Sequence, residues 1–553
     1  MRRVHDIEHP GALRHAWLPL ALAASSVMAQ APGTLADPRL PLPEVAPART
    51  AVIQLPAPPA AEPQAAGRSL TVDRVVFDGN TVFTAGQLAG VVAPYLHRPV
   101  TPLELAEAAE RVTDFYVQHG YTLASAMVSS QKPSGGVVHI GVREGRVASV
   151  TVQGTRRYST QDVEANLGRA GAGQFHRGSD LESGLRQLNR LPGLSAKAVV
   201  QPVGADGTTG LLIDARERPL DVTLTADNHA RASLGRERMT LDAVLNTPLR
   251  LGDRLHVVAT GSRDDRLRYG EVAYDAPLWT QGPRVGIAIA DARLDATAGA
   301  GVTVPAENRL GRVQLGQVLR DTRQDLVIAS VGASHSVAEA DLAGNAIPRS
   351  RLMLAELSAM VTRTYGSLAA TQAALALQSN FHKPGVTGCA AGGRCEEVGL
   401  RAELDLQHLQ PIWARFDGYA RVDGVWSEDP LPEVLQFTLG GPASVRAFQA
   451  ADVRGDRGIF TSAGMREAFT VGGAIVHGRV FFDRGHGECL RIRPACTVAH
   501  DALTGYGVGL DARWPLSAMT LSGKADVSLP AGHRDLGNDA RVFASVAVGW
   551  PGQ

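Results

Sequence analysis

The chain has 553 residues, with 55 Lys and Arg against 55 Asp and Glu, so its formal net charge is zero. A protein that binds nucleic acid normally has a basic excess or a basic stripe, and neither is visible here. The chain is too long for one ordinary soluble domain, so we expect several domains. Its 59 glycines exceed the average share of about 7%, which favours a fold with many strands and turns.

Residues 1–29 are typical of a signal peptide for export. Three arginines precede an apolar stretch at 16–24, and small residues ending in Ala29-Gln30-Ala31 follow it. This order matches a secretory signal peptide, although a disordered tail is the alternative. No later segment has the roughly 18 consecutive apolar residues of a membrane-spanning helix. A membrane protein with this sequence must therefore be a closed barrel, the other fold that satisfies its backbone hydrogen bonds in lipid.

Residues 30–68 are rich in proline and alanine. Proline removes a backbone donor and fixes an extended φ, so we expect a semi-stiff linker rather than a packed domain. Only residues 48–55 leave room for a helix in this stretch.

Residues 69–145 and 146–217 predict two small α+β units with the same order, β-α-α-β-β. In the first unit a strand at 69–77 precedes a helix near Thr84 and a longer helix from Thr101-Pro102 to His119-Gly120. These helix limits follow from a capping threonine with proline at the first helical position, and from glycine at the end. The second unit predicts a strand at 147–152, helices at 160–167 and 179–191, and strands at 196–202 and 209–215.

Residues 218–553 predict a transmembrane antiparallel β-barrel of about sixteen strands, at about 20 residues per strand and connection for spans of about 9–11 residues. Apolar and polar residues alternate along segments such as 400–406, 413–423 and 519–529. Charges on one face and lipid-compatible residues on the other are the pattern of a barrel with a polar lumen. A soluble β-sandwich is the alternative, but the export signal and the number of such segments favour the barrel. The fold class is thus mainly β.

Four cysteines fall in two local pairs, Cys389 with Cys395 and Cys489 with Cys496. Each pair lies in a loop-like segment of an exported chain, so we expect two disulfides. A metal site is the alternative, but the spacing and the lack of nearby histidines do not suit zinc. We expect no cofactor.

The motifs, taken in order, resemble one family. The first unit carries Phe77-Asp78-Gly79-Asn80 and Val142-Arg143-Glu144-Gly145-Arg146, and the second carries Leu188-Asn189-Arg190-Leu191-Pro192-Gly193. The barrel region carries Val445-Arg446-Ala447-Phe448 and Phe481-Phe482-Asp483-Arg484-Gly485. The chain thereby resembles the two-partner secretion transporters of the hemolysin-activator type, whose small units are POTRA (polypeptide-transport-associated) domains.

The resemblance implies a specific contact inside the barrel. In the family a V-R-G-[FY] motif lies at the tip of a loop that folds into the lumen, and its arginine pairs with the aspartate of F-x-D-x-G. It therefore implies that Arg446 binds Asp483, with Val445, Phe448, Phe481 and Gly485 as supporting residues. The alternative is that both are scattered, solvated lumen charges. Ala447 departs from the family glycine and tolerates positive φ poorly, so the tip is expected to bend differently.

The resemblance also implies the function. We expect a monomeric pore in the outer membrane, in contact with its lipid, which secretes a large adhesin- or hemolysin-like partner captured in extended form by the POTRA units and the lumen. An outer-membrane assembly factor of the same superfamily is the alternative, although such proteins carry three or more POTRA units. No G-x-S-x-G, H-E-x-x-H or nucleotide-binding motif is present, so no enzymatic activity is expected. Trp550 is expected to replace the terminal aromatic residue of many outer-membrane barrels.

Overall fold

The structure is a computed structural model that describes residues 53–54, 69–128, 135–175, 177–202, 208–297, 303–342, 345–366, 369–380, 399–413, 415–492, 496, 500–532 and 539–551. It contains two compact units, one within residues 49–217 and one from Arg218 to the C-terminus. Within the described ranges, no helix is long and apolar enough to cross a membrane. The signal-peptide prediction and the pair Cys389 and Cys395 lie outside the described residues.

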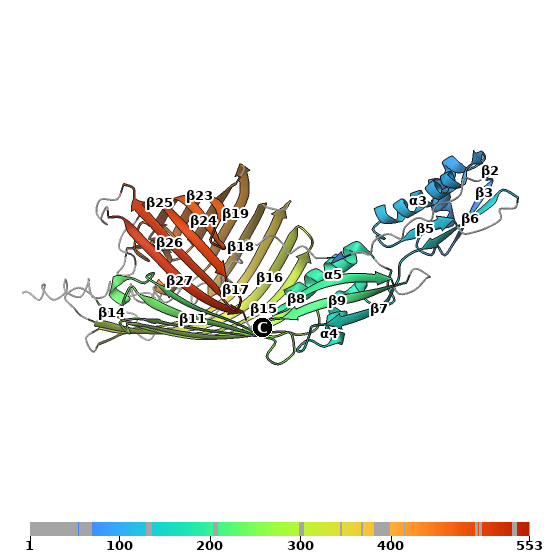
Figure 1. Cartoon of the computed structure of the whole chain (residues 1–553). Helices are drawn as coiled ribbons and strands as arrows, with labels where there is room; N and C mark the ends of the chain where they lie inside the picture. Colours follow the sequence, from blue (N-terminus) through green and yellow to red (C-terminus); the bar gives the residue numbers. More distant parts are fainter. Residues whose placement is uncertain are drawn as a thin grey trace, which may run out of the picture. The chain divides into compact units, whose positions relative to one another are not determined.

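The first small unit has the predicted β-α-α-β-β order. Thr84 and Thr101 each close a capping box at the start of a helix, and His119 is the C-cap of the longer one. The sheet order is β3-β6-β5, with β3 parallel and β5 antiparallel to β6, and β2 pairs with β4 beside it. The elements are β2 Leu70–Thr71, β3 Arg74–Asp78, α2 Ala85–Val92, β4 Pro99–Val100, α3 Pro102–Gln118, β5 Ser125–Val128 and β6 Val137–Arg143 (Figure 1).

The second unit repeats this topology. Its sheet order is β8-β9-β7, with β7 parallel and β8 antiparallel to β9. The elements are β7 Val147–Gln153, α4 Thr160–Leu167, α5 Gly178–Arg190, β8 Leu194–Pro202 and β9 Thr209–Glu217. Leucines on α5 and alternate residues of β8 form its core.

A glycine and a glutamate occupy corresponding positions in the two units, and both contribute to the packing of the segment after the first strand. Gly79 and Gly154 have φ of +89° and +85°, and a Cβ at either would lie within 2.5 Å of a carbonyl oxygen of the last strand. Glu144 accepts hydrogen bonds from the backbone N–H groups of Thr81 and Val82, at 2.7 Å each. Glu217 likewise accepts from the N–H groups of Arg157 and Tyr158. Each unit therefore ties the segment after its first strand to a glutamate at its end.

One short element differs from the prediction for 30–68. Ile53–Gln54 forms β1, which pairs in parallel with Ala198 and Val199 of β8. The stretch 48–55, considered above for a helix, thus contains a strand. Ile53 is β-branched, and β-branched residues favour an extended backbone. Pro56, two residues after the strand, has no backbone N–H to donate.

In the described part of the chain, sixteen strands close into one antiparallel barrel in sequence order, in which β10 pairs with β27 (Figure 1). The predicted barrel and the predicted fold class are confirmed. The strands are β10 Leu220–Asp227, β11 Arg238–Asn246, β12 Arg254–Ser262, β13 Leu267–Pro277, β14 Arg284–Thr297, β15 Thr303–Asp321, β16 Asp325–Leu342, β17 Asn345–Tyr365, β18 Ala369–Asn380, β19 Arg401–Trp413, β20 Phe416–Ser427, β23 Arg457–Val471, β24 Ala474–Glu488, β25 His500–Pro515, β26 Thr520–Pro530 and β27 Arg541–Pro551.

Burial separates the two faces of the barrel wall. On β24, Val480 and Phe482 are about half exposed, whereas Phe481 and Asp483 are buried. Large aromatic residues lie exposed near the barrel end where β10 begins: Trp279, Tyr365, Trp413, Trp514 and Trp550. An apolar outer band with aromatic residues at its rim is the surface that a bilayer requires.

Candidate functional site

The segment between β20 and β23, residues 428–456, is the in-barrel loop. It contains a 3-10 turn at Glu433–Leu435 and a short antiparallel pair, β21 Phe437–Leu439 and β22 Val453–Gly455. Its side chains, including Val445 and Phe448, form one buried cluster with inward-facing residues of β17, β20, β23 and β25. The wall residues of this cluster are Leu352, Leu354, Val425, Phe460 and Leu503. The loop therefore packs against the inner wall.

The loop tip brings Arg446 onto Asp483. The arginine Nε donates to Asp483 Oδ2 at 2.8 Å and one terminal nitrogen donates to Oδ1 at 2.7 Å. The Arg446 backbone N–H also donates to Oδ2, at 3.1 Å. Arg446 is 8% exposed and Asp483 is 0% exposed. The planar guanidinium matches the carboxylate with two parallel bonds, a geometry that lysine lacks.

Three neighbours complete the surroundings of the pair. The guanidinium carbon lies 3.4 Å from the centre of the Phe481 ring, a cation–π contact. Ser462 on β23 donates to Asp483 at 2.8 Å and accepts from Arg446 at 3.0 Å. Ser528 on β26 donates to the Arg446 carbonyl oxygen at 2.7 Å. Contacts from β23, β24 and β26 therefore hold both the side chain and the backbone of the arginine.

Glycines on the wall make space for the loop. A Cβ at Gly485 would lie 2.5 Å from the Leu439 side chain, and one at Gly505 would lie 2.6 Å from the Cβ of Ala447. A side chain at Gly485, the glycine of the F-x-D-x-G motif, would therefore collide with the loop. The positive φ values of the described loop fall at Gly440, Gly441 and Ala451 and not at Ala447. The backbone of Ala447 therefore does not adopt a left-handed conformation, and the different bend expected at this tip stays a prediction.

A second group of buried charges lies beside the pair. Arg479 on β24 donates to Asp526 at 3.1 Å and also pairs with Asp511. Asp526 is 1% exposed and lies 4.0 Å from Arg446. Arg421 on β20 binds Asp423 at 2.7 Å and donates to the loop carbonyl of Ala443 at 3.3 Å. This network was not predicted, because each residue looks like any other inward charge in an alternating strand.

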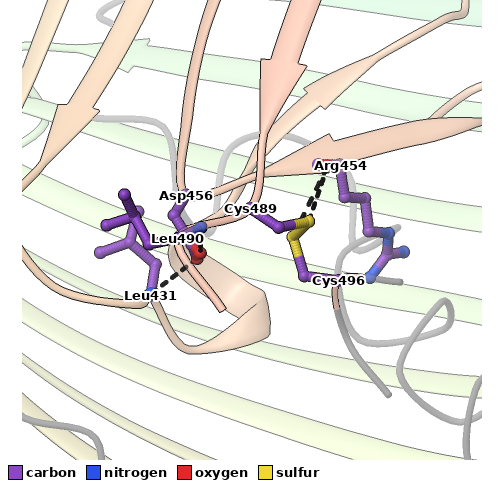
Figure 2. Close-up of a disulfide and its surroundings, with 6 residues drawn as sticks. All are labelled: Leu431, Arg454, Asp456, Cys489, Leu490 and Cys496. Carbon is purple, nitrogen blue, oxygen red and sulfur yellow. Dashed lines mark hydrogen bonds between the residues drawn. A yellow bond between two sulfur atoms is a disulfide. The ribbon is translucent and has the colours of Figure 1, made fainter. Parts of the chain in front are cut away.

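The loop base, where the loop meets β23 and the segment after β24, is held separately. Asp456 is 0% exposed and accepts from the backbone N–H groups of Leu431 at 2.8 Å and Leu490 at 2.9 Å (Figure 2). Cys489 and Cys496 form a disulfide, and both sulfur atoms lie within 4 Å of the Arg454 carbonyl oxygen. The disulfide therefore lies beside β22.

The structure brings together all the predicted barrel residues that it describes: Val445, Arg446, Phe448, Phe481, Asp483 and Gly485. It adds Ser462, Ser528, Arg401, Asp456 and Asp526, of which Arg401 donates to the loop carbonyl of Leu435 at 3.1 Å. Across the described ranges, no three His, Cys, Asp or Glu side chains gather to hold a metal ion. The arrangement supplies ion pairs and packing that position a loop.

Comparisons with known proteins agree with this architecture. The family model for the ShlB-type POTRA domain matches residues 70–145, and that for the haemolysin secretion/activation protein ShlB/FhaC/HecB matches residues 292–512. The outer membrane transporter CdiB of Escherichia coli O6:K15:H31 (strain 536 / UPEC) is 25% identical over 419 residues, 71% of this chain and 68% of that protein. The heme/hemopexin transporter protein HuxB of Haemophilus influenzae (strain 86-028NP) is 22% identical over 220 residues, 39% of each chain.

Solved structures share the fold. CdiB from Escherichia coli aligns with a TM-score of 0.66 at 20% identity, over 99% of this chain and 100% of that one. BamA from Haemophilus ducreyi lacking POTRA domains 1–3 aligns with a TM-score of 0.54 at 12% identity, over 87% of this chain and 100% of that one. At these identities the similarity establishes the fold alone.

Fold, site and family models define an outer-membrane transporter with a β-barrel and periplasmic POTRA domains. Within that class the chain matches the ShlB-type POTRA and ShlB/FhaC/HecB family models and is homologous to the CdiB two-partner secretion transporters, a family that transports partner exoproteins. The family resemblance and the outer-membrane location expected from the sequence are confirmed.

Proposed function

We propose that this chain secretes one large partner exoprotein of the adhesin or hemolysin type from the periplasm to the cell surface, and that the in-barrel loop gates the pore. The observation that carries the gating proposal is the bidentate contact between Arg446 and Asp483, which holds the loop tip against the inner wall. A loop held there occupies lumen space that a passing polypeptide needs.

The chain direction supports entry of the loop from the cell surface. β10 begins at Leu220, directly after the periplasmic POTRA domains, so its first residue lies on the periplasmic side. β20 is the eleventh strand of the antiparallel barrel and therefore ends on the opposite side. The loop that follows β20 thus folds inward from the outer mouth, where a secreted chain leaves.

In this proposal the POTRA domains bind the partner in extended form, and one monomer forms the pore. The partner's own folding outside biases its movement, since the periplasm offers no ATP. An assembly factor for outer-membrane proteins is the second candidate, because the barrel fold is similar to that of BamA. Two POTRA units, where assembly factors typically carry three or more, favour secretion.

The test is export of the protein encoded beside this chain's gene, in cells with and without this chain. We expect export to stop without the chain while the outer-membrane protein profile stays normal. Unchanged export would contradict the proposal, and a general loss of outer-membrane proteins would favour the assembly factor.

A further inference from the structure

The segment between β10 and β11, residues 228–237, lies at the same mouth of the barrel as the in-barrel loop. We call it the first loop. β10 is the first strand of the antiparallel barrel and β20 the eleventh, so both strands end on the same side. The two loops that follow them therefore start from one mouth and can contact each other.

The first loop places a leucine against the inner wall. Leu234 ends the 3-10 turn Ala232–Leu234 and is 1% exposed. On β14, Leu294 is buried whereas Ile289 is 67% exposed, and residues an odd number apart face opposite sides of a strand. The cluster that contains Leu294 and Leu234 therefore faces the lumen. Its wall residues, from β13, β14, β15 and β16, are Leu267, Leu294, Ala296, Ala306 and Ala338.

The Leu234 cluster extends to the in-barrel loop. Val434, in the 3-10 turn Glu433–Leu435 of that loop, packs against the Leu234 cluster. Val434 also packs against the buried cluster that the in-barrel loop forms with the opposite part of the wall. These apolar side chains stay out of water together only while both loops are in place.

An ion pair joins the two loops at a second point. Arg231 donates to Oδ1 of Asp452, and the two side chains are 21% and 12% exposed. The other oxygen of Asp452 accepts from the Gln449 N–H at 2.8 Å. Since Val434 precedes the tip residue Arg446 and Asp452 follows it, the first loop contacts both arms of the in-barrel loop.

The ends of the first loop are fixed to the barrel wall. Asn228 donates to the Val542 carbonyl of β27 at 3.0 Å and accepts from the Ala544 N–H at 2.8 Å. At the other end, Arg238 donates twice to Asp227, at 2.8 and 3.2 Å. The contacts with the in-barrel loop are therefore made from an anchored base.

We propose that the first loop is a second part of the gate and holds the in-barrel loop in the lumen through Leu234 and Arg231. This inference rests on the proposed gating by the in-barrel loop. To leave the lumen, the in-barrel loop must separate Val434 from the Leu234 cluster and Asp452 from Arg231, in addition to releasing Arg446. The first loop thus stabilises the closed pore through contacts other than the Arg446–Asp483 pair.

The ion current through the purified full chain in a planar lipid bilayer tests the role of Leu234. We expect Leu234→Ala to raise the fraction of time in the open state by about tenfold or more, because removing a buried leucine side chain usually costs more than a tenfold shift in an equilibrium. Protease cleavage of residues 428–456 should rise with it. Leu234→Met, which keeps a similar volume, should recover most of the closure. Arg236→Ala, at an exposed position of the same loop, is the control.

A double-mutant cycle on the ion pair gives a second readout. Asp452→Asn keeps one oxygen for the Gln449 N–H and presents its NH2 group to Arg231, so the ion pair is lost. Arg231→Ala should raise the open fraction severalfold in the wild-type chain and add little in Asp452→Asn, because contacting residues are not additive. A purely local destabilisation by each substitution would instead give additive effects.

The outcomes separate this inference from the proposed gating. If Leu234→Ala leaves current and cleavage unchanged, or if the effects of Arg231→Ala and Asp452→Asn add, the first loop takes no part in the gate. Arg446→Ala, measured in the same bilayer, tests the gate itself. If Arg446→Ala also leaves current and cleavage at the wild-type level, the in-barrel loop does not gate the pore and the proposed function is wrong on that point.

Discussion

The methyl group of Ala447 at the loop tip lies where a side chain at Gly505 would have to be, since a Cβ at Gly505 would come within 2.6 Å of it. Ala447 stands in place of the glycine of the family motif, and β25 has no side chain opposite. The extra methyl group at the tip is thus accommodated by a glycine on the wall. The loop tip therefore approaches β25 closely at Gly505.

This relationship predicts a compensating pair of substitutions. Gly505→Ala should displace the loop tip at a cost of about 1–3 kcal/mol, the usual range for overpacking, and protease should cut residues 428–456 faster. Ala447→Gly in the same chain should restore resistance because it removes the opposing methyl group. Gly311→Ala is the control, since nothing lies within 4 Å of a Cβ there. Equal cleavage of Gly505→Ala and Gly311→Ala would refute the steric account.

The loop base should open independently of the tip. Asp456→Ala removes the acceptor for the N–H groups of Leu431 and Leu490, and a buried donor left unpaired costs about 1–3 kcal/mol. Hydrogen exchange of segments 428–436 and 486–492 should accelerate, while exchange around Arg446 changes less. Asp456→Asn keeps one acceptor oxygen, so its exchange rates should lie between those of the wild type and of Asp456→Ala. A uniform change along the whole loop would show that base and tip are one unit.

Glu144 should make the first POTRA domain sensitive to acid. Burial raises the pKa of Glu144, but hydrogen bonds from Thr81, Val82 and Tyr116 outweigh it, so the pKa lies below the ordinary 4.5. A carboxyl group whose folded pKa is depressed stabilises the fold above its unfolded pKa and loses this contribution as the pH falls through the folded value. Exchange protection of residues 74–143 should therefore decline below about pH 4.5.

Two substitutions isolate the Glu144 contribution. Glu144→Ala should destabilise the domain by roughly 2–3 kcal/mol at neutral pH, the upper range for hydrogen bonds to a charged group. Glu144→Gln should cost less and should flatten the dependence on acid, because its side chain does not titrate. An unchanged acid profile in Glu144→Gln would mean that another group is responsible.

Much of the fold could be predicted because its signals are local. The capping residues Thr84 and Thr101 placed both helices of the first unit, and strict alternation on β24 placed Asp483 on the inner face. The pairing of β1 with β8 could not be predicted, since two residues in a proline-rich stretch carry no periodicity and their partner lies far along the chain. The roles of Glu217 and Asp456 could not be predicted either. Each carboxylate accepts hydrogen bonds from backbone N–H groups, and such contacts leave no pattern in the sequence.

Only the family resemblance could indicate the Arg446–Asp483 contact. Arg446 lies in a loop and Asp483 in a strand 37 residues later, and no periodic pattern connects the two. Loss of one member of a buried pair typically costs roughly 3–5 kcal/mol. Arg446→Lys should recover only part of this energy, since an ammonium group cannot form the two parallel bonds. Arg263→Ala, which breaks an exposed ion pair with Glu237, should have little effect.

The most direct test of the gating account is to measure export of the partner and protease cleavage of residues 428–456 together, in Arg446→Ala and in Asp483→Ala. The account predicts that both variants reach the outer membrane, lose export and expose the loop to cleavage. Wild-type export with an uncut loop in both variants would contradict it.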